Sequence, residues 1–558
     1  MLEEHQKSIE NSKKFFQRTI ISSKQEEIDL QHSIAYSALN SDLLDLALKK
    51  SDSSVLPNRH ILVEQYLPQL DSFIKEEEKK LLSKAKSVSS SSDGFSDRSR
   101  RSWISLAISF VQDWKIHVIH PELVFVNDSC TSELIHQVTS KVYSEWLPEN
   151  CLIATSTTDG ASNERNASAA LVKEGNDLWC CSHLANLCIR DIFDSLSDDT
   201  KVYREVVRKA HSLVVFIRGH SASIRKFNEL SQKKRNSEKP SDEKFETLIL
   251  DNVTRWDSTL TLLQRVVYFD SEIIELCTMD GSEIPREYIL ARDQFDLAQV
   301  MVDILLHFRL FSKTLQSRNT PTLCFVPASV DKLVDSLQPN SETRKWKLLS
   351  KSVIEQSNKL QELLVEQVKN RFSWVFEKES LALAAALLCP GQSALKYKHF
   401  KVTNQMKQHV INHLYRDALE FEDNPSETRK TYIRASLLAA LELVEQANPD
   451  ESECPLLWWS KQEDVGVIRT VVEMMLAIPA SSAENERAHH GMALTQKPER
   501  NQLSISTLQR EYRVQQYFAT GLEGLSTAEN RALTTQKARN LLLRYETWKQ
   551  QQEKQVTS

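Results

Sequence analysis

The chain has 558 residues, so one hydrophobic core cannot serve it, and we expect several domains or one domain with a large insertion. The formal net charge of −6 argues against phosphate binding over the whole surface, so any nucleic-acid contact must come from local basic patches. The longest apolar run, residues 381–388, is too short for a membrane span, and nine irregularly spaced cysteines are typical of a reducing compartment, cytosol or nucleus. We expect no membrane partner.

The first predicted elements are helices, in a region that we place at residues 1–85. Apolar residues recur at three- and four-residue spacing over residues 34–47 and again over 61–82, as on one face of an amphipathic helix. A serine-rich run at 87–92 comes next and ends in Asp93. Taken by itself, such a run is a flexible linker. Only if the run is extended does Asp93 stand at the end of a strand.

Strands and helices alternate over the following hundred residues or so. The pattern predicts extended segments at 102–110, 114–126, 152–155 and 178–181, and helices at 132–147, from about 161, and after the last extended segment. This alternating order is typical of an α/β fold. Residues 86–257 are therefore expected to form the first part of an α/β core.

The rest of the chain is predicted to be helical almost throughout. Residues 258–447 form an all-helical block, which is either a domain of its own or an insertion. After a polar linker, residues 448–525 carry further helices, and residues 526–558 form a C-terminal helix or tail. Glycine is scarce, with 10 residues in all, which disfavours an all-β fold with many tight turns. The predicted fold class is mixed α/β and rich in helix.

Two aspartates stand where functional groups are expected. Asp159 comes just after the predicted strand at 152–155, and Asp93 lies 159 − 93 = 66 residues before it. Open α/β sheets place functional groups at strand ends, because side chains there face a crevice. Two facing carboxylates repel each other unless a cation screens them, and their hard oxygen atoms favour Mg²⁺ or Mn²⁺. A two-metal phosphoryl-transfer site would need a third carboxylate.

Glu486 is our candidate for the third carboxylate. The preceding SSAE (481–484) is a capping-box pattern, so a helix should begin near residue 482 and end near Gly491. The cap would occupy Glu484 and leave Glu486 pointing elsewhere, with Arg487 beside it. By spacing alone, two aspartates and a helical glutamate are more often surface groups than a metal site.

Five short motifs follow one another in a fixed order along the chain. Together they resemble the ordered signature of hAT transposases, and the resemblance covers residues 30–520 approximately. The motifs are TTDGASN (157–163), CCSHLANL (180–187), DNVTRWDST (251–259), PLLWW (455–459) and PASSAENER (479–487).

The resemblance implies a ribonuclease-H-like nuclease core that a helical insertion splits between its second and third acidic residues. The gap of 486 − 159 = 327 residues between Asp159 and Glu486 agrees with such an insertion. By motif, Asp93, Asp159 and Glu486 correspond to the three catalytic, metal-binding carboxylates of the family. The family's mechanism would use two Mg²⁺ or Mn²⁺ ions, one to activate water or a 3′-hydroxyl and one to stabilise the leaving oxygen of the phosphate.

Further residues match positions that contact DNA in the family. Arg255 and Trp256 correspond to an Arg-Trp pair whose tryptophan is thought to stack on a flipped base, and the alternative is that Trp256 packs as a core aromatic. Cys180 and His183 match a Cys-x₂-His motif. We interpret them as near-site structural or DNA-contacting residues, because no partner pair with zinc-finger spacing follows. Arg487 is a further candidate for DNA contact.

The C-terminal part of the chain carries the dimer interface in the family. The resemblance therefore implies a homodimer or a higher oligomer. Trp458 and Trp459 are candidate anchors of this interface, although such residues more commonly pack a helix against its own core.

The sequence departs from the family in two places. The BED-type zinc finger with which members usually begin is not found, and the first cysteine is Cys130. After Glu486 the segment is shorter than usual, and His489 and His490 stand near where an aromatic residue would pack. Two functions are therefore expected: a nuclear, metal-dependent DNA transposase, or a non-catalytic dimeric relative that binds DNA or chromatin.

Overall fold

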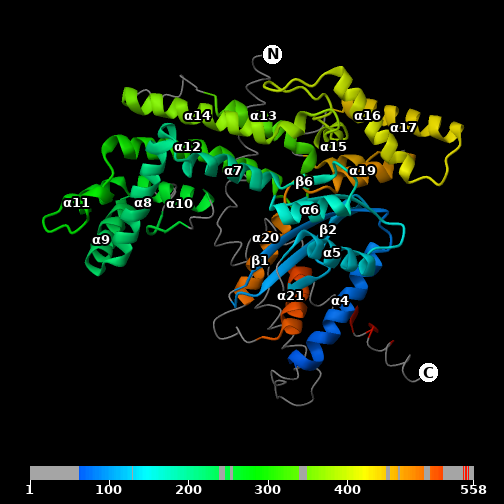
Figure 1. The fold of residues 1–558 in the computed structure, drawn as a ribbon, viewed down its shortest axis with the longest axis horizontal. Coiled ribbons are helices and arrows are strands. Elements are labelled where there is room, and N and C mark those ends of the chain that lie inside the picture. Colours follow the sequence, from blue (N-terminus) through cyan, green and yellow to red (C-terminus); the bar gives the residue numbers. More distant parts are fainter. Residues whose placement is uncertain are drawn as a thin grey trace.

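The computed structural model of the chain has a mixed α/β fold that is rich in helix, as the sequence predicts (Figure 1). The predicted helix at 34–47 lies outside the residues that the structure describes. The described residues are 62–97, 99–127, 130–237, 245–251, 256–338, 349–447, 453–462, 465–495 and 503–519, together with 544, 545, 547, 548 and 551.

One mixed sheet carries the strands of the described chain. They are β1 (Ser87–Ser96), β2 (Ser102–Gln112), β3 (Lys115–Ile119), β4 (Leu123–Val126), β5 (Leu152–Thr158) and β6 (Asp177–Trp179). Their order is β3-β2-β1-β5-β6, and β4 pairs with the start of β2. β2 is antiparallel to its neighbours, whereas β1, β5 and β6 run parallel to one another.

The serine-rich run forms the buried strand β1 in the middle of this sheet, so the linker interpretation is wrong. Ser89 and Ser90 are each 1% exposed. Side chains from both faces bond to two of the serine hydroxyls: Ser90 bonds to the hydroxyl of Tyr143, and Ser91 accepts from the amide of Asn485 at 3.0 Å, whereas Oγ of Ser89 is buried without a hydrogen-bond partner. The bonds at Ser90 and Ser91 help a strand of small polar residues to occupy a position where apolar side chains are more usual.

The predicted extended segment at 114–126 is two short strands rather than one. β3 and β4 both pair with β2, at Ile119 opposite Ile108 and at Leu123 opposite Ser105. Pro121 lies in the break between them. Proline has no N–H to donate to a strand ladder, so the pairing is interrupted there and resumes after the turn.

Helices cover both faces of the sheet. On one face lie α5 (Ser132–Trp146) and α6 (Ser162–Leu171), and on the other lie α19 (Arg469–Leu476) and α20 (Ala483–Thr495). Successive side chains of β2 point to opposite faces, as in any strand. Its apolar residues Leu106, Ile108 and Phe110 pack with α5, whereas Ser105 and Ser109 form hydrogen bonds on the side of α19 and α20.

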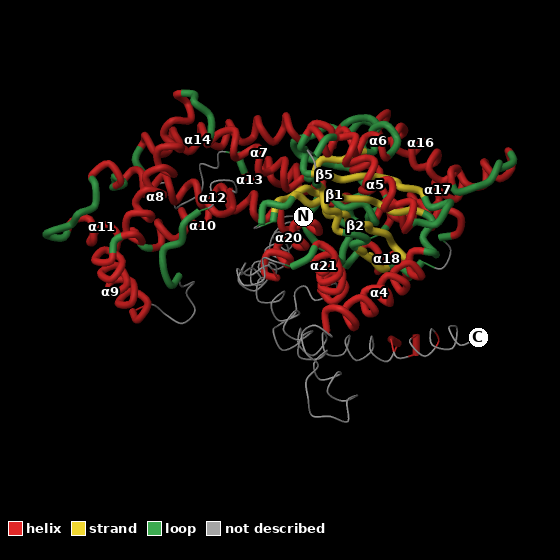
Figure 2. Tube along the Cα trace, turned by 60° about the horizontal axis from the view of Figure 1, so that its bottom comes forward, coloured by secondary structure: helices red, strands yellow, loops and turns green. Residues whose placement is uncertain are grey.

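A large helical region follows the last strand. Figure 2 shows that α8, α9 and α11 lie away from the strands, whereas α5, α6 and α20 lie against them. Buried residues of α8 such as Tyr203 and Val206 share one core with residues of α10 and α12. After α7 (Cys181–Phe193), its longer helices are α8 (Lys201–Gly219), α9 (Ser221–Ser237), α10 (Trp256–Tyr268), α11 (Asp270–Thr278), α12 (Arg292–Leu315), α13 (Val326–Ser336), α14 (Lys351–Arg371), α15 (Leu381–Leu387), α16 (Asn404–Glu420) and α17 (Glu427–Gln446).

The C-terminal elements return to the sheet. After α18 (Pro455–Ser460) and the helices α19 and α20, the helix α21 (Ile505–Ala519) packs against α4 (Leu67–Leu82), which confirms the helix predicted at 61–82. Phe73 of α4 and Phe518 of α21 share one apolar cluster. Among the described helices, none has both the length and the apolar character that crossing a membrane requires.

Candidate metal centre

Three carboxylates meet where β1 and β5 lie side by side. The parallel register pairs Ser91 with Thr157, two residues before Asp93 and Asp159 respectively. Glu164, in the first turn of α6, joins them, and one oxygen from each of the three side chains lies within 4.8 Å of the others. The structure thus brings together two of the three carboxylates that the sequence predicts, and it adds one that the sequence analysis missed.

Glu164 is the most buried of these three carboxylates. It is 8% exposed, its Oε1 accepts a hydrogen bond from the backbone N–H of Gly94 at 2.7 Å, and its Oε2 is buried without a hydrogen-bond partner. A Cβ atom at position 94 would lie 2.8 Å from Oε1, so glycine is needed for this close approach. Burial, and then the charge of Asp159, raise the pKa of Glu164 to about 7 although the Gly94 N–H lowers it.

A signal for Glu164 was present in the sequence. A helix that directly follows a strand starts at the strand's carboxyl end, so its first turn lies next to residues at that edge of the sheet. Glu164 falls five residues after Asp159 and in the first turn of that helix. Placing the helix start would therefore have placed Glu164 near the aspartates.

Asp159 is held at the start of α6. Its Oδ1 accepts from the backbone N–H of Ala161 at 3.0 Å. Gly160 between them has φ +97°, a conformation that side chains other than glycine rarely adopt, and a Cβ there would lie 3.7 Å from the ring of His183. The turn therefore fixes the carboxylate of Asp159 and leaves room for His183 beside it.

Asp93 is contacted by a histidine from α20. Nδ1 of His489 lies 3.5 Å from Oδ2 of Asp93, and Nε2 of the same ring bonds to Ser105 Oγ at 2.6 Å. The ring also packs on Phe95, with centroids 3.8 Å apart. His489 is thus anchored between β1 and β2 and borders the acidic centre. It packs on Phe95 at a position where the family resemblance implies an aromatic residue.

Glu486 lies outside the group of three carboxylates but faces the same region. It is exposed in the first turn of α20. Burial lowers the pKa of His183, and the charges of Asp159 and Glu486 both oppose this shift. The charges of Asp159, just after β5, and of Glu486, on α20, therefore both act on the same imidazole ring.

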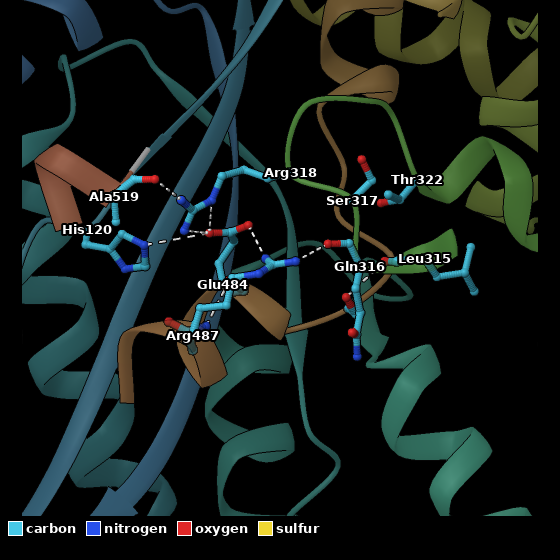
Figure 3. A network of polar contacts seen from close by, with 12 residues as sticks. His120, Leu315, Gln316, Ser317, Arg318, Thr322, Glu484, Arg487 and Ala519 are labelled. Carbon is cyan, nitrogen blue, oxygen red and sulfur yellow. Dashed lines mark hydrogen bonds and ion pairs between the residues drawn. The ribbon is translucent and has the colours of Figure 1, made fainter. Parts of the chain in front are cut away.

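Glu484, expected to cap α20, forms a buried ion-pair network instead (Figure 3). Its carboxylate lies 2.5 Å from Nη2 of Arg318 and 2.5 Å from Nη1 of Arg487. Burial raises the pKa of Glu484, but the two guanidinium groups outweigh it and bring the pKa to about 2. Arg318 also donates to the carbonyl of Ala519 at 3.1 Å, so the network joins the helical region, α20 and the end of α21.

Arg487 is engaged inside the protein. Besides its ion pair with Glu484, it donates from Nη2 to the carbonyl of Gln316, as Figure 3 shows. Both terminal nitrogens of this predicted DNA contact thus have protein partners, and the side chain links α20 to the end of α12.

Cys180 is a core residue next to the candidate centre. It is 1% exposed, and its Sγ accepts from the backbone N–H of Ser482 at 3.4 Å. Burial, helped by the charge of Glu486, raises the pKa of the thiol to about 11. The contact ties the start of α7 to the start of α20, which fits the predicted near-site structural role.

The Arg-Trp motif is only partly described. Trp256 begins α10, and Arg255 lies outside the described residues. Nearby Asp251 is buried, with Oδ1 2.6 Å from Nδ1 of His211 and Oδ2 accepting from Thr259 at 3.3 Å. Asp251 therefore helps to hold α8 and α10 together.

Trp459 is fully buried and offers no surface to a partner chain. Its Nε1 donates to the carbonyl of Leu388 at 2.9 Å, and its ring stacks on Trp114 with centroids 6.2 Å apart. Trp458 packs edge-on against it and is partly exposed. The neighbouring Leu457 is 53% exposed.

Residues 178–302 match a family model described as the ZBED1 RNase-like helical domain. The match supports an hAT-like origin. It runs from β6 through α7 to α11 and into α12, so α8 and α9 fall within the matched helical domain. Together with the sheet, it makes the architecture that of a helix-rich, ribonuclease-H-like protein. No curated protein matches the chain.

Proposed function

We propose that this chain is an hAT-type, transposase-derived protein that cuts and transfers DNA strands with Mg²⁺ or Mn²⁺ held at Asp93 and Asp159. The observation that carries the proposal is the convergence of these two side chains, from adjacent parallel strands, within 4.8 Å of each other and of Glu164. Paired carboxylates at neighbouring strand ends are a suitable support for phosphoryl-transfer chemistry.

The residues present fit a hard divalent cation. Three carboxylates this close repel one another when ionised, and Oε2 of Glu164 is buried without a partner. A donor set made only of carboxylate oxygens suits Mg²⁺ or Mn²⁺ better than a softer metal such as zinc. When bound, the ions of the family's two-metal scheme supply Lewis-acid stabilisation of charge at the scissile phosphate.

The chain's own residues hold and orient the carboxylates. The Ala161 N–H fixes Asp159, and His489 borders Asp93 from α20. For Glu486 we propose the catalytic role that the family resemblance implies, because its carboxylate is exposed in the first turn of α20. For His183, whose pKa the charges of both Asp159 and Glu486 influence, we propose contact with the DNA backbone.

DNA is the proposed partner and the nucleus the proposed compartment, both on the strength of the hAT-like origin. Self-association is proposed through the C-terminal part of the chain. Because Trp459 is buried, we propose that Leu457 and the exposed part of Trp458 contribute to this interface.

A second candidate function is non-catalytic DNA or chromatin binding. It is favoured by Glu486, which lies outside the tight carboxylate group of the described residues, and by His489, which stands beside Asp93. The two functions predict opposite results in one assay.

The deciding experiment is nicking of supercoiled DNA by the purified full-length chain. We expect nicking by the wild type with Mn²⁺ or Mg²⁺, no nicking with a chelator, and loss of nicking in Asp159→Asn. Glu174→Gln is the matched control, since Glu174 is exposed in the loop between α6 and β6. Equal nicking by wild type and Asp159→Asn, or none by the wild type with either metal, would overturn strand cleavage in favour of binding alone.

A further inference from the structure

We propose that Glu164 is a direct ligand of the divalent cation, forming the third side of the centre with Asp93 and Asp159. This inference rests on the proposed metal-dependent function and deepens it by naming a ligand that the family motifs do not supply. It assigns a ligating role to the first turn of α6, whereas the sequence motifs place the third carboxylate on α20.

The first argument is the state of the Glu164 side chain. More than nine-tenths of the residue is buried, yet Oε2 has no hydrogen-bond partner, while Oε1 is fixed by the Gly94 N–H. A buried carboxylate oxygen without a partner is costly, because it loses its hydration and receives nothing in return. A cation bound by the carboxylate of Glu164 would offset the cost of burying it.

The second argument is the construction around it. Gly94 belongs to β1, one residue after Asp93, and its N–H holds Glu164 against that strand. Ala161 holds Asp159 at the start of the same helix that carries Glu164. The backbone thus fixes two of the three carboxylates independently of each other and turns them toward a common point.

A purely structural role explains less. An acidic residue in the first turn of a helix is favourable because the N-terminal end carries partial positive charge. That effect is available to an exposed glutamate and requires neither burial nor the approach to Gly94. It also gives no reason for two aspartates to lie within 4.8 Å of the same carboxylate.

The test is a titration of the full-length chain with Mn²⁺ in the absence of DNA. Electron paramagnetic resonance measures the free Mn²⁺ that remains. We expect Glu164→Gln to weaken Mn²⁺ affinity by roughly tenfold or more, because a ligand charge is lost while the amide oxygen can still accept from Gly94. Glu174→Gln, outside the centre, should bind as the wild type does. Wild-type affinity in Glu164→Gln would overturn the proposal.

Stability without metal separates ligation from a structural role. In the presence of a chelator, Glu164→Gln should unfold at the same or higher urea concentration than the wild type, since a desolvated charge is removed. A structural role predicts the reverse, lower stability with unchanged Mn²⁺ affinity, and would overturn ligation. Should Glu164→Gln fail to fold, Glu164→Asp is the second variant. It keeps the charge, but its shorter side chain moves the carboxylate oxygens away from Asp93 and Asp159, so the same weakening of Mn²⁺ affinity is expected.

The outcomes also separate this inference from the proposed function. A wild type that binds Mn²⁺ through Glu164 but never nicks DNA supports the ligand and overturns strand cleavage. A wild type that nicks DNA while Glu164→Gln keeps full Mn²⁺ affinity supports cleavage and overturns the ligand.

Discussion

Nδ1 of His489 lies 3.5 Å from Oδ2 of Asp93, so α20 contacts the acidic centre through an imidazole ring. The other ring nitrogen bonds to Ser105 Oγ, and the ring packs on Phe95. We interpret His489 as a positioning residue that holds the carboxylate of Asp93.

His489→Phe keeps the ring contact with Phe95 and removes both nitrogens. We expect a modest loss of stability, about 1 kcal/mol, because the buried Ser105 loses one of its hydrogen-bond partners. Single-turnover nicking with Mn²⁺ should fall roughly tenfold, as the carboxylate of Asp93 is held less firmly. His409→Phe, at an exposed position of α16, is the control, and an unchanged nicking rate in His489→Phe would contradict a positioning role.

The buried hydrogen bond between Ser90 and Tyr143 is predicted to stabilise the folded protein. Ser90→Ala leaves the Tyr143 hydroxyl without its partner inside the core, and Tyr143→Phe does the same to Ser90. Each change should lower the free energy of unfolding by about 1–3 kcal/mol in urea titrations. The double variant should lose less than the sum, because it leaves no unpaired group; strict additivity would show that the bond contributes nothing.

Removing Arg318 should be much more damaging than removing an arginine from a surface ion pair. Arg318→Met leaves Glu484 buried with a weaker set of partners and the Ala519 carbonyl without this donor. We expect a loss of about 3–5 kcal/mol in the free energy of unfolding. Arg190→Met breaks the exposed pair with Asp194 and should cost less than about 1 kcal/mol. Similar losses in both variants would contradict the structural importance of the network.

The stability of the chain should fall as pH rises from about 4.5 to about 8, because of Glu78 of α4. Burial raises the pKa of Glu78 to about 8, although Arg513 lowers it. The folded protein therefore favours the protonated carboxyl, and its contribution to stability is present below the unfolded pKa of about 4.5 and is lost as pH rises through 8. Glu78→Gln should gain on the order of 4 kcal/mol relative to the wild type between pH 5 and pH 9, measured by urea unfolding. A difference that does not change with pH would contradict the raised pKa.

Local patterns predicted most of the sheet and its covering helices. Alternating apolar residues indicated β2, and amphipathic spacing indicated α4 and α5. When one face of a helix or strand is buried, apolar residues recur in the sequence at the period of that element. The serines of β1 carry no such period. Their burial depends on Tyr143 and Asn485, which come from distant parts of the chain.

The candidate centre was predicted in part for the same reason. Asp93 and Asp159 could be paired because each follows or ends a strand, and parallel strands end at one edge. The start of α6 could have placed Glu164 near the aspartates, but the close approach of its carboxylate to Gly94, 70 residues away in the chain, is recorded by no local pattern. The contact of His489 with Asp93 depends likewise on how α20 docks on β1 and β2.

The docking of α20 has a consequence for folding during translation. A ribosome that has completed β5 must still add more than three hundred residues before α20 emerges, a wait of tens of seconds at about 5–20 residues per second. During that time the face of the sheet that bears Ser91, Ser105 and Ser109 lacks its cover. A nascent chain therefore has Asp93, Asp159 and Glu164 long before His489 and Glu486 of α20 can reach them, and chaperones have a defined surface to shield meanwhile.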